Sequence, residues 1–135
     1  MTGTPTAEGV AMGHEISIAG SGVYLICRVT EPITLEVARA FTAALDAASH
    51  ARGIKRFLVD VRAAPNVASV LQNYRFANVD MSEMALQRDV RSAILVAADD
   101  HSHDFVETVS QNAGYGVRLF RDEAAAIAWL EEDLR

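Results

Sequence analysis

The stretch NAGYGVRLFRDEAAAIAWLE, residues 112–131, encodes a strand followed by a helix. Residues 117–120 form a short apolar run that is typical of a strand. Asp122 then stands where a helix N-cap is expected, because its carboxylate can accept hydrogen bonds from the first free backbone amides. The apolar residues expected on the inner face of this helix are Ile127, Trp129, Leu130 and Leu134. We therefore predict that Trp129 is buried.

Upstream of this stretch, short apolar runs alternate with segments of helical periodicity. The strands that the pattern predicts are 15–18, 23–29, 57–60, 93–97 and 117–120. The predicted helices run from Thr34 to Gly53, from Pro65-Asn66 onward, from about Asp104 to near Gly114, and from Asp122 onward. The turn Gly20-Ser21-Gly22 makes the first two strands a hairpin, and residues 93–97 are expected as the central strand. Residues 81 and 84, both methionines, either continue the second helix or begin another one.

The order β-β-α-β-α-β-α-β-α predicts an α/β fold, in which a mixed, mostly parallel sheet carries about four helices. The chain has 135 residues, of which 50% are hydrophobic, so it can bury one core without disulfides or metals. We expect a flexible segment at residues 1–13 and one domain at residues 14–135. The single cysteine, Cys27, lies in an apolar run and is expected as a small buried hydrophobe.

Charge and composition exclude several classes of partner. The net charge is −6 and the chain has one lysine, Lys55, so the basic patch of a nucleic-acid-binding protein is missing. No apolar run approaches the length of a membrane span, and the first residues lack the pattern of a signal peptide. These features favour a cytoplasmic protein.

Residues 112–131, together with the order of the predicted elements, resemble SpoIIAA-like members of the STAS family, the sulfate-transporter and anti-sigma-factor antagonist domain. The resemblance implies a STAS-like fold and a regulatory or binding module that needs no cofactor. In anti-sigma antagonists a serine in an Asp-Ser-Ser-Gly-like turn after the third strand is phosphorylated. Residues 59–69 contain no such turn, so Ser69 is not assigned that role. Other members of the group resemble lipid-binding proteins in fold, which implies apolar ligands.

Polar residues follow two of the predicted strands. Asp60 and Arg62 end one strand, and the loop after the next carries four candidates: Asp99, Asp100, His101 and His103. If the two strands are neighbours, these ends lie close together, where α/β sheets often bind ligands. Such groups can bind a metal or transfer protons, which would make a hydrolase or metal-dependent enzyme. The interpretation that we favour is a solvated loop with Ser102 or Asp104 as a helix N-cap, because His-x-His lacks a dependable third ligand. We therefore expect no tightly bound metal.

Residues 71–84 carry more apolar side chains than one buried stripe requires: Tyr74, Phe76, Val79, Met81 and Met84. The surplus predicts either a ligand pocket or self-association face, where aromatic residues and Met are enriched, or simply a helix buried on two sides. If the segment binds something, Tyr74 or Phe76 should be partly exposed in the isolated chain.

Two hypotheses follow. The favoured one is a non-enzymatic module that binds a protein partner, an apolar small molecule or a second copy of itself. Its candidate residues are Tyr74, Phe76, Met81, Met84, Asp60, Asp99 and His101, with no cofactor or metal. The alternative is the small hydrolase or metal-dependent enzyme, which requires the Asp and His side chains to converge in one cleft.

Overall fold

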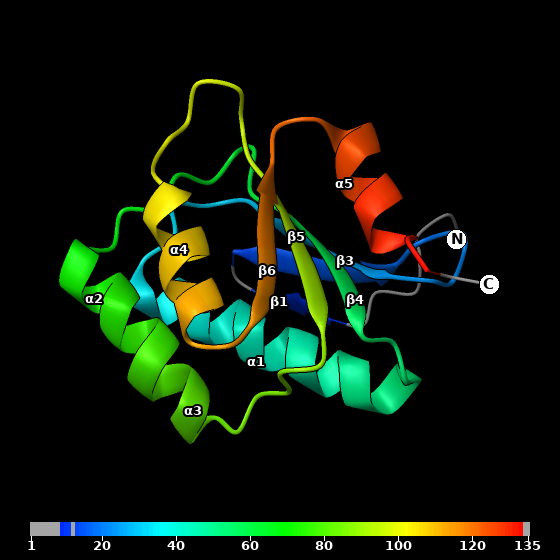
Figure 1. Cartoon of the computed structure of the whole chain (residues 1–135), viewed down its shortest axis with the longest axis horizontal. Coiled ribbons are helices and arrows are strands. Elements are labelled where there is room, and N and C mark those ends of the chain that lie inside the picture. The colour runs from blue at the N-terminus through cyan, green and yellow to red at the C-terminus, as the bar shows by residue number, and fades with distance from the viewer. Residues whose placement is uncertain (1–8, 12, 134–135) are drawn as a thin grey trace.

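The computed structural model describes residues 9–11 and 13–133. Within them the chain forms one six-stranded sheet in the order β1-β2-β3-β4-β5-β6 (Figure 1). The strands are β1 (Gly9–Ala11), β2 (His14–Ile18), β3 (Leu25–Val29), β4 (Arg56–Asp60), β5 (Arg91–Leu95) and β6 (Gly116–Phe120). The helices are α1 (Leu35–Arg52), α2 (Val70–Arg75), the π-helix η1 (Phe76–Asp80), α3 (Met81–Glu83), α4 (Asp104–Asn112) and α5 (Glu123–Leu130). None of these helices combines the length and the apolarity that crossing a bilayer requires.

The sheet is mixed and mostly parallel, as the element order predicts. Strands β2 and β3 form an antiparallel hairpin, whereas β3, β4, β5 and β6 pair in parallel. Two expectations were wrong. Residues 9–11 belong to the sheet as β1, paired with β2, and not to a flexible segment; residues 1–8 and 12 lie outside the described residues. Strand β5 is also not central, because β3 and β4 form the middle of the sheet.

Helix ends follow the local signals in the sequence. The Thr34 side chain accepts a hydrogen bond from the Val37 amide at 3.2 Å, and Asp122 does the same for the Ala125 amide at 2.9 Å. Helix α1 ends at Gly53, which has a φ of 68° and donates its N–H to the Ser49 carbonyl at 2.8 Å. A left-handed residue at this position favours glycine.

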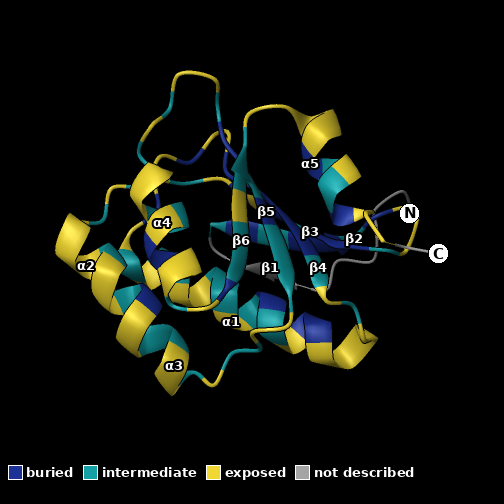
Figure 2. Cartoon of the chain, in the orientation of Figure 1, coloured by how far each residue is buried: buried dark blue, intermediate teal, exposed yellow. Residues whose placement is uncertain are grey.

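Two apolar layers hold the sheet between helices, and Figure 2 shows strand residues buried beneath helices whose outer faces are exposed. Side chains alternate between the two faces of a strand. In β4, Phe57 and Val59 therefore pack in the layer that includes Leu45 of α1. Leu58 of the same strand packs in the opposite layer with Leu130 of α5. The continuous apolar run of β4 thus reflects burial on both faces.

The second helix begins later than predicted, at Val70 and not at Pro65-Asn66. Asn66 instead forms a parallel bridge with Ile33, supported by the Val67 amide donating to the Ile33 carbonyl at 2.9 Å. The actual start is a capping box, in which Ser69 and Gln72 each accept the other's backbone N–H. The helix then continues through η1 into α3, which decides the question left open about residues 81 and 84.

Two expectations near the other helices also need correction. Helix α4 has His103 at its N-cap position, without a side-chain cap, in place of Ser102 or Asp104. Trp129 is half-buried and not buried. Its ring lies 5.6 Å from that of Phe120, and the Arg91 guanidinium sits 5.1 Å from its centroid. Leu134 lies outside the described residues.

Candidate functional site

Asp60 does not join the residues that follow β5, although β4 and β5 are neighbours in the sheet. Strand alternation places Asp60 on the same face as Leu58, the face that α5 covers. Its carboxylate accepts hydrogen bonds from Arg62 at 2.8 Å and Arg28 at 3.4 Å. Burial alone would raise the pKa of Asp60, but these arginines lower it below its usual value. Asp60 is therefore a buried, paired carboxylate.

His103 has a structural position beneath the loop that follows β4. It is 3% exposed, and its Nε2 lies 3.0 Å from the carbonyl oxygen of Ala64 and 3.5 Å from an Asp100 carboxylate oxygen. A carbonyl oxygen only accepts, so Nε2 carries the hydrogen. Burial lowers the pKa of His103, although Ala64 and Asp100 oppose that effect. The ring is consequently neutral at pH 7.

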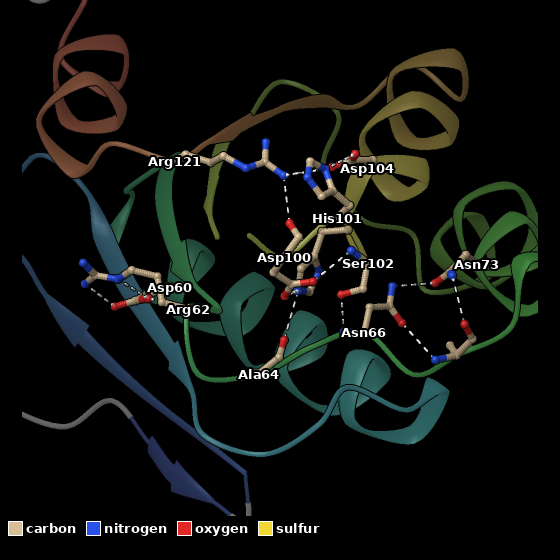
Figure 3. A network of polar contacts seen from close by, with 12 residues as sticks. Asp60, Arg62, Ala64, Asn66, Asn73, Asp100, His101, Ser102, Asp104 and Arg121 are labelled. Carbon is tan, nitrogen blue, oxygen red and sulfur yellow. Dashed lines mark hydrogen bonds and ion pairs between the residues drawn. The ribbon is translucent and has the colours of Figure 1, made fainter. Parts of the chain in front are cut away.

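His101 belongs to a separate, exposed group. Its Nδ1 lies 3.1 Å from an Asp104 carboxylate oxygen and 3.2 Å from an Arg121 nitrogen. Figure 3 shows this group apart from Asp60 and Arg62. Asp99 is exposed on the same loop. Across the described part of the chain, no three His, Cys, Asp or Glu side chains come close enough to hold a metal ion.

Asp100 and Ser102 shape this loop. Asp100 accepts the Ser102 amide at 2.9 Å, and the Ser102 hydroxyl accepts the Asn66 amide at 2.9 Å. Asn66 in turn donates from its side chain to Asn73 of α2 at 3.1 Å (Figure 3). Two of the polar residues that suggested an enzyme, Asp100 and His103, thus help to connect the loops after β4 and β5 to each other. Cys27 offers no alternative nucleophile, because burial raises the pKa of its thiol to about 12.

An apolar cavity of about 140 Å³ lies among the described residues. It lies between the α1 side of the sheet and helices α1, η1, α3 and α4. Its apolar lining includes Leu45, Phe41, Phe57, Val59, Ile94, Val106 and Val117. Of the predicted site residues, Phe76 and Met81 line this cavity. Tyr74 is 52% exposed on the outer side of α2, and Met84 is half-buried outside the lining.

The wall formed by α2, η1 and α3 packs on the rest of the domain with few buried side chains. Neither α2 nor α3 contains a buried residue, and Ala77 is the buried residue of η1. An ion pair of 2.9 Å between Arg39 of α1 and Asp80 of η1 joins this wall to the opposite side of the cavity. Segments with few buried contacts open most readily, and π-helical turns inside helices often occur at functional sites.

The apolar side chains of residues 71–84 lie on two faces. Phe76 and Met81 line the cavity, whereas Tyr74 is exposed to solvent.

Tyr115 is the notable polar residue of the cavity. It lines the cavity and is 4% exposed, yet its hydroxyl has no hydrogen-bond partner among the described residues. Buried hydroxyl groups are ordinarily paired, so this one stands out. The Arg88 guanidinium covers the Tyr115 ring at 4.6 Å.

Two glycines flank Tyr115, which directly precedes β6. Gly114 has a φ of 93°, which allows the chain to turn between α4 and β6. A Cβ on Gly116 would lie 2.6 Å from the carbonyl oxygen of Val90, so only glycine permits this approach. The sequence reasoning missed Tyr115, although the Gly-Tyr-Gly spacing marks it as a residue held in a fixed turn.

A shallower depression adjoins the cavity at the start of α1 and α2. Thr34, Leu35 and Ala68 line both, and the depression adds Glu36, Gln72 and Val67, which is exposed. The cavity and the depression therefore share part of their lining.

Comparison with known proteins agrees with this fold. A family model described as SpoIIAA-like matches residues 24–131. Among solved structures, the chain is similar to an uncharacterised protein of the DUF3478 family from Shewanella loihica, which has a SpoIIAA-like fold. The TM-score is 0.54 at 18% identity, over 90% of this chain and 99% of the other. No curated protein matches the chain.

Proposed function

Because the chain belongs to the SpoIIAA-like family, we propose that it is a non-enzymatic binding module and that its cavity holds an apolar small molecule. Its fold is mixed α/β and SpoIIAA-like, as the resemblance implied. We also propose a cytoplasmic location, which fits a chain whose single cysteine is a buried free thiol.

The observation that carries this proposal is the cavity between α1 and the η1–α3 wall. Ligand sites are concave and mostly apolar, with a small number of polar groups that orient the ligand. The cavity has this composition, and Phe76 and Met81 come from the segment with the apolar surplus. Methionine adapts its shape to irregular apolar partners.

The polar loop favours the non-enzymatic reading over a hydrolase or metal enzyme. Asp60 is paired with two arginines on the α5 side of the sheet, and His103 donates to a backbone carbonyl. His101 lies on the surface with Asp104. These side chains point to different partners, whereas general acid–base catalysis requires them to meet around one reacting atom.

A protein partner or a second copy of the chain is a second candidate, favoured by a different observation. The wall and the segment before it expose five large apolar side chains: Val67, Val70, Leu71, Tyr74 and Val79. Contiguous exposed apolar side chains mark interaction surfaces on small domains. Sedimentation at increasing concentration, with Leu71→Glu as the variant, tests whether this surface associates with itself.

A titration with toluene tests the proposed function directly, because toluene is apolar and fits a cavity of this size. Chemical shifts of backbone amides are followed in ¹H–¹⁵N spectra as toluene is added. We expect shifts confined to residues that line the cavity. Phe76→Asp places a carboxylate at the lining and should abolish them, with the circular-dichroism spectrum unchanged.

The matched control is Tyr74→Asp, which introduces the same charge two residues away on the exposed side of α2. It should leave toluene binding intact. Shifts scattered over the surface, or a Phe76→Asp variant that binds toluene like the parent, would count against the cavity as the binding site.

A further inference from the structure

We propose that the ligand of the cavity is a small, uncharged ring compound with one hydroxyl or carbonyl group, and that this group hydrogen-bonds to the Tyr115 hydroxyl. This inference rests on the proposed function and names the chemical class of its ligand. Three separate observations support this ligand class: the volume of the cavity, the unpaired hydroxyl of Tyr115 and the charges of the lining.

The volume limits the ligand to about one ring. The cavity measures about 140 Å³. An apolar cavity of about 150 Å³ accommodates benzene, so a compound with one aromatic or alicyclic ring fills this one. A long acyl chain exceeds that volume and would have to extend beyond the cavity into the adjoining depression. Aromatic side chains in the lining, Phe41, Phe57 and Phe76, suit contact with a flat ring.

The unpaired hydroxyl of Tyr115 calls for one polar group on the ligand. Tyr115 is 4% exposed and lines the cavity, and its hydroxyl has no partner among the described residues. A buried hydroxyl without a partner is unfavourable, and a ligand hydroxyl or carbonyl relieves this state. A site that is built to hydrogen-bond one group also discriminates against ligands that lack it.

The charges of the lining exclude ionised ligands. No lysine or arginine in the described part of the chain lines the cavity. The ionisable acid in the lining, Asp46, already accepts from Gln87 at 3.4 Å and pairs with His50 at 3.4 Å. His103 donates its Nε2 hydrogen to Ala64 and stays uncharged. A carboxylate ligand would therefore lose its hydration without meeting a cation, which is strongly unfavourable.

Three ring compounds distinguish these features: phenol, toluene and benzoate, titrated at pH 7 by calorimetry. We expect phenol and toluene to bind the wild-type chain and benzoate to bind at least about ten-fold more weakly than phenol. Tyr115→Phe should weaken the binding of phenol by about five-fold or more, since the ligand hydroxyl is then buried without a partner. The affinity for toluene should change by less than about two-fold.

The matched control is Tyr24→Phe, because Tyr24 is a buried tyrosine in the layer on the opposite face of the sheet. It should leave the affinities for phenol and toluene unchanged. In the wild-type chain, nuclear Overhauser effects between phenol and the ring of Tyr115 provide the same answer without a substitution.

The outcomes separate the inference from the proposed function. If toluene binds in the cavity but phenol does not, or if phenol binds the Tyr115→Phe variant equally well, the inference is wrong and the apolar cavity remains a binding site. Benzoate binding as tightly as phenol, or phenol without contacts to Tyr115, overturns it as well. If neither toluene nor phenol binds, both the inference and the proposed function fail.

Discussion

His103 Nε2 donates a hydrogen bond to the carbonyl oxygen of Ala64, 3.0 Å away, and thereby joins the loop after β5 to the loop after β4. The second of these loops leads into Asn66 and Ala68, which line the cavity. One buried imidazole therefore helps to hold this part of the cavity lining in place, with Asp100, Asp104 and Arg121 as the charged groups that act on it.

Protonation of His103 should destabilise the fold. Burial lowers its pKa below the ordinary value of 6.5, so the unfolded chain takes up the proton first as the pH falls. The contribution of neutral His103 to stability is complete above about pH 6.5. It is lost as the pH falls from that value to the folded-state pKa. His103→Gln should reduce the slope of unfolding free energy against pH between 7 and 5, by at most about 1.4 kcal/mol per pH unit. Urea unfolding at several pH values measures it.

The matched control for that experiment is His50→Gln, which removes an exposed imidazole from α1. His14 is buried and its pKa is also lowered by burial, so some slope should remain in the His103 variant. An unchanged slope in His103→Gln would show that His103 does not titrate in this range.

Asp80→Asn should open the wall of the cavity more often without unfolding the domain. The change breaks the ion pair between Asp80 of η1 and Arg39 of α1. Water reaches this pair through Arg39, which is 47% exposed, and ion pairs at the surface contribute about 0–1 kcal/mol, so the loss of stability should be small. Toluene should enter and leave faster, with its dissociation constant changed by less than about two-fold. Line-shape analysis of the toluene titration reports both rates.

A comparable surface ion pair serves as the control for Asp80. Lys55 and Asp89 are paired away from the cavity lining, so Asp89→Asn removes a similar interaction. Its exchange rates should match those of the parent. Equal exchange rates in Asp80→Asn and the parent would show that this pair does not hold the wall closed.

Trp129→Ala should cost about 1–3 kcal/mol of unfolding free energy. A fully buried aromatic residue typically costs about 3–5 kcal/mol, but Trp129 is half-buried. The loss comes from its contacts with Phe120, Arg91 and Arg118. Chemical denaturation measures this cost. In the wild-type chain, the fluorescence maximum of Trp129 should lie between those of buried and hydrated indole. A near-neutral change would mean that these contacts add little to stability.

Local signals in the sequence were sufficient to predict most elements. Thr34, Gly53 and Asp122 act through groups within a few residues of themselves, so their capping roles can be read from the sequence. The Ser69-x-x-Gln72 capping box was equally legible, and it would have placed the start of α2 correctly. Pro65-Asn66 misled the prediction because Asn66 pairs with Ile33, far away in the chain.

The candidate site depended on contacts between distant segments. Phe76 and Met81 were predicted from an apolar surplus, but the periodicity did not say which side chains face the cavity and which, like Tyr74, face solvent. The helix passes through the π-helix η1 between Tyr74 and Met81, so the spacing of an ordinary α-helix does not describe this segment. Tyr115 was not predicted because its significance lies in an unpaired hydroxyl, which exists only once the fold buries this side chain.

The sequence by itself determined the α/β class, the parallel sheet and the ends of most helices, because caps, turns and apolar periodicity act over short distances. The tertiary structure decided which contacts are made by the polar residues after β4 and β5 and by the apolar side chains of residues 71–84. Asp60 faces α5 and not His103, since alternation along β4 assigns it to a face whose covering helix lies more than sixty residues away in the chain. The cavity exists because helices and strands from distant parts of the sequence leave a space that their side chains do not fill.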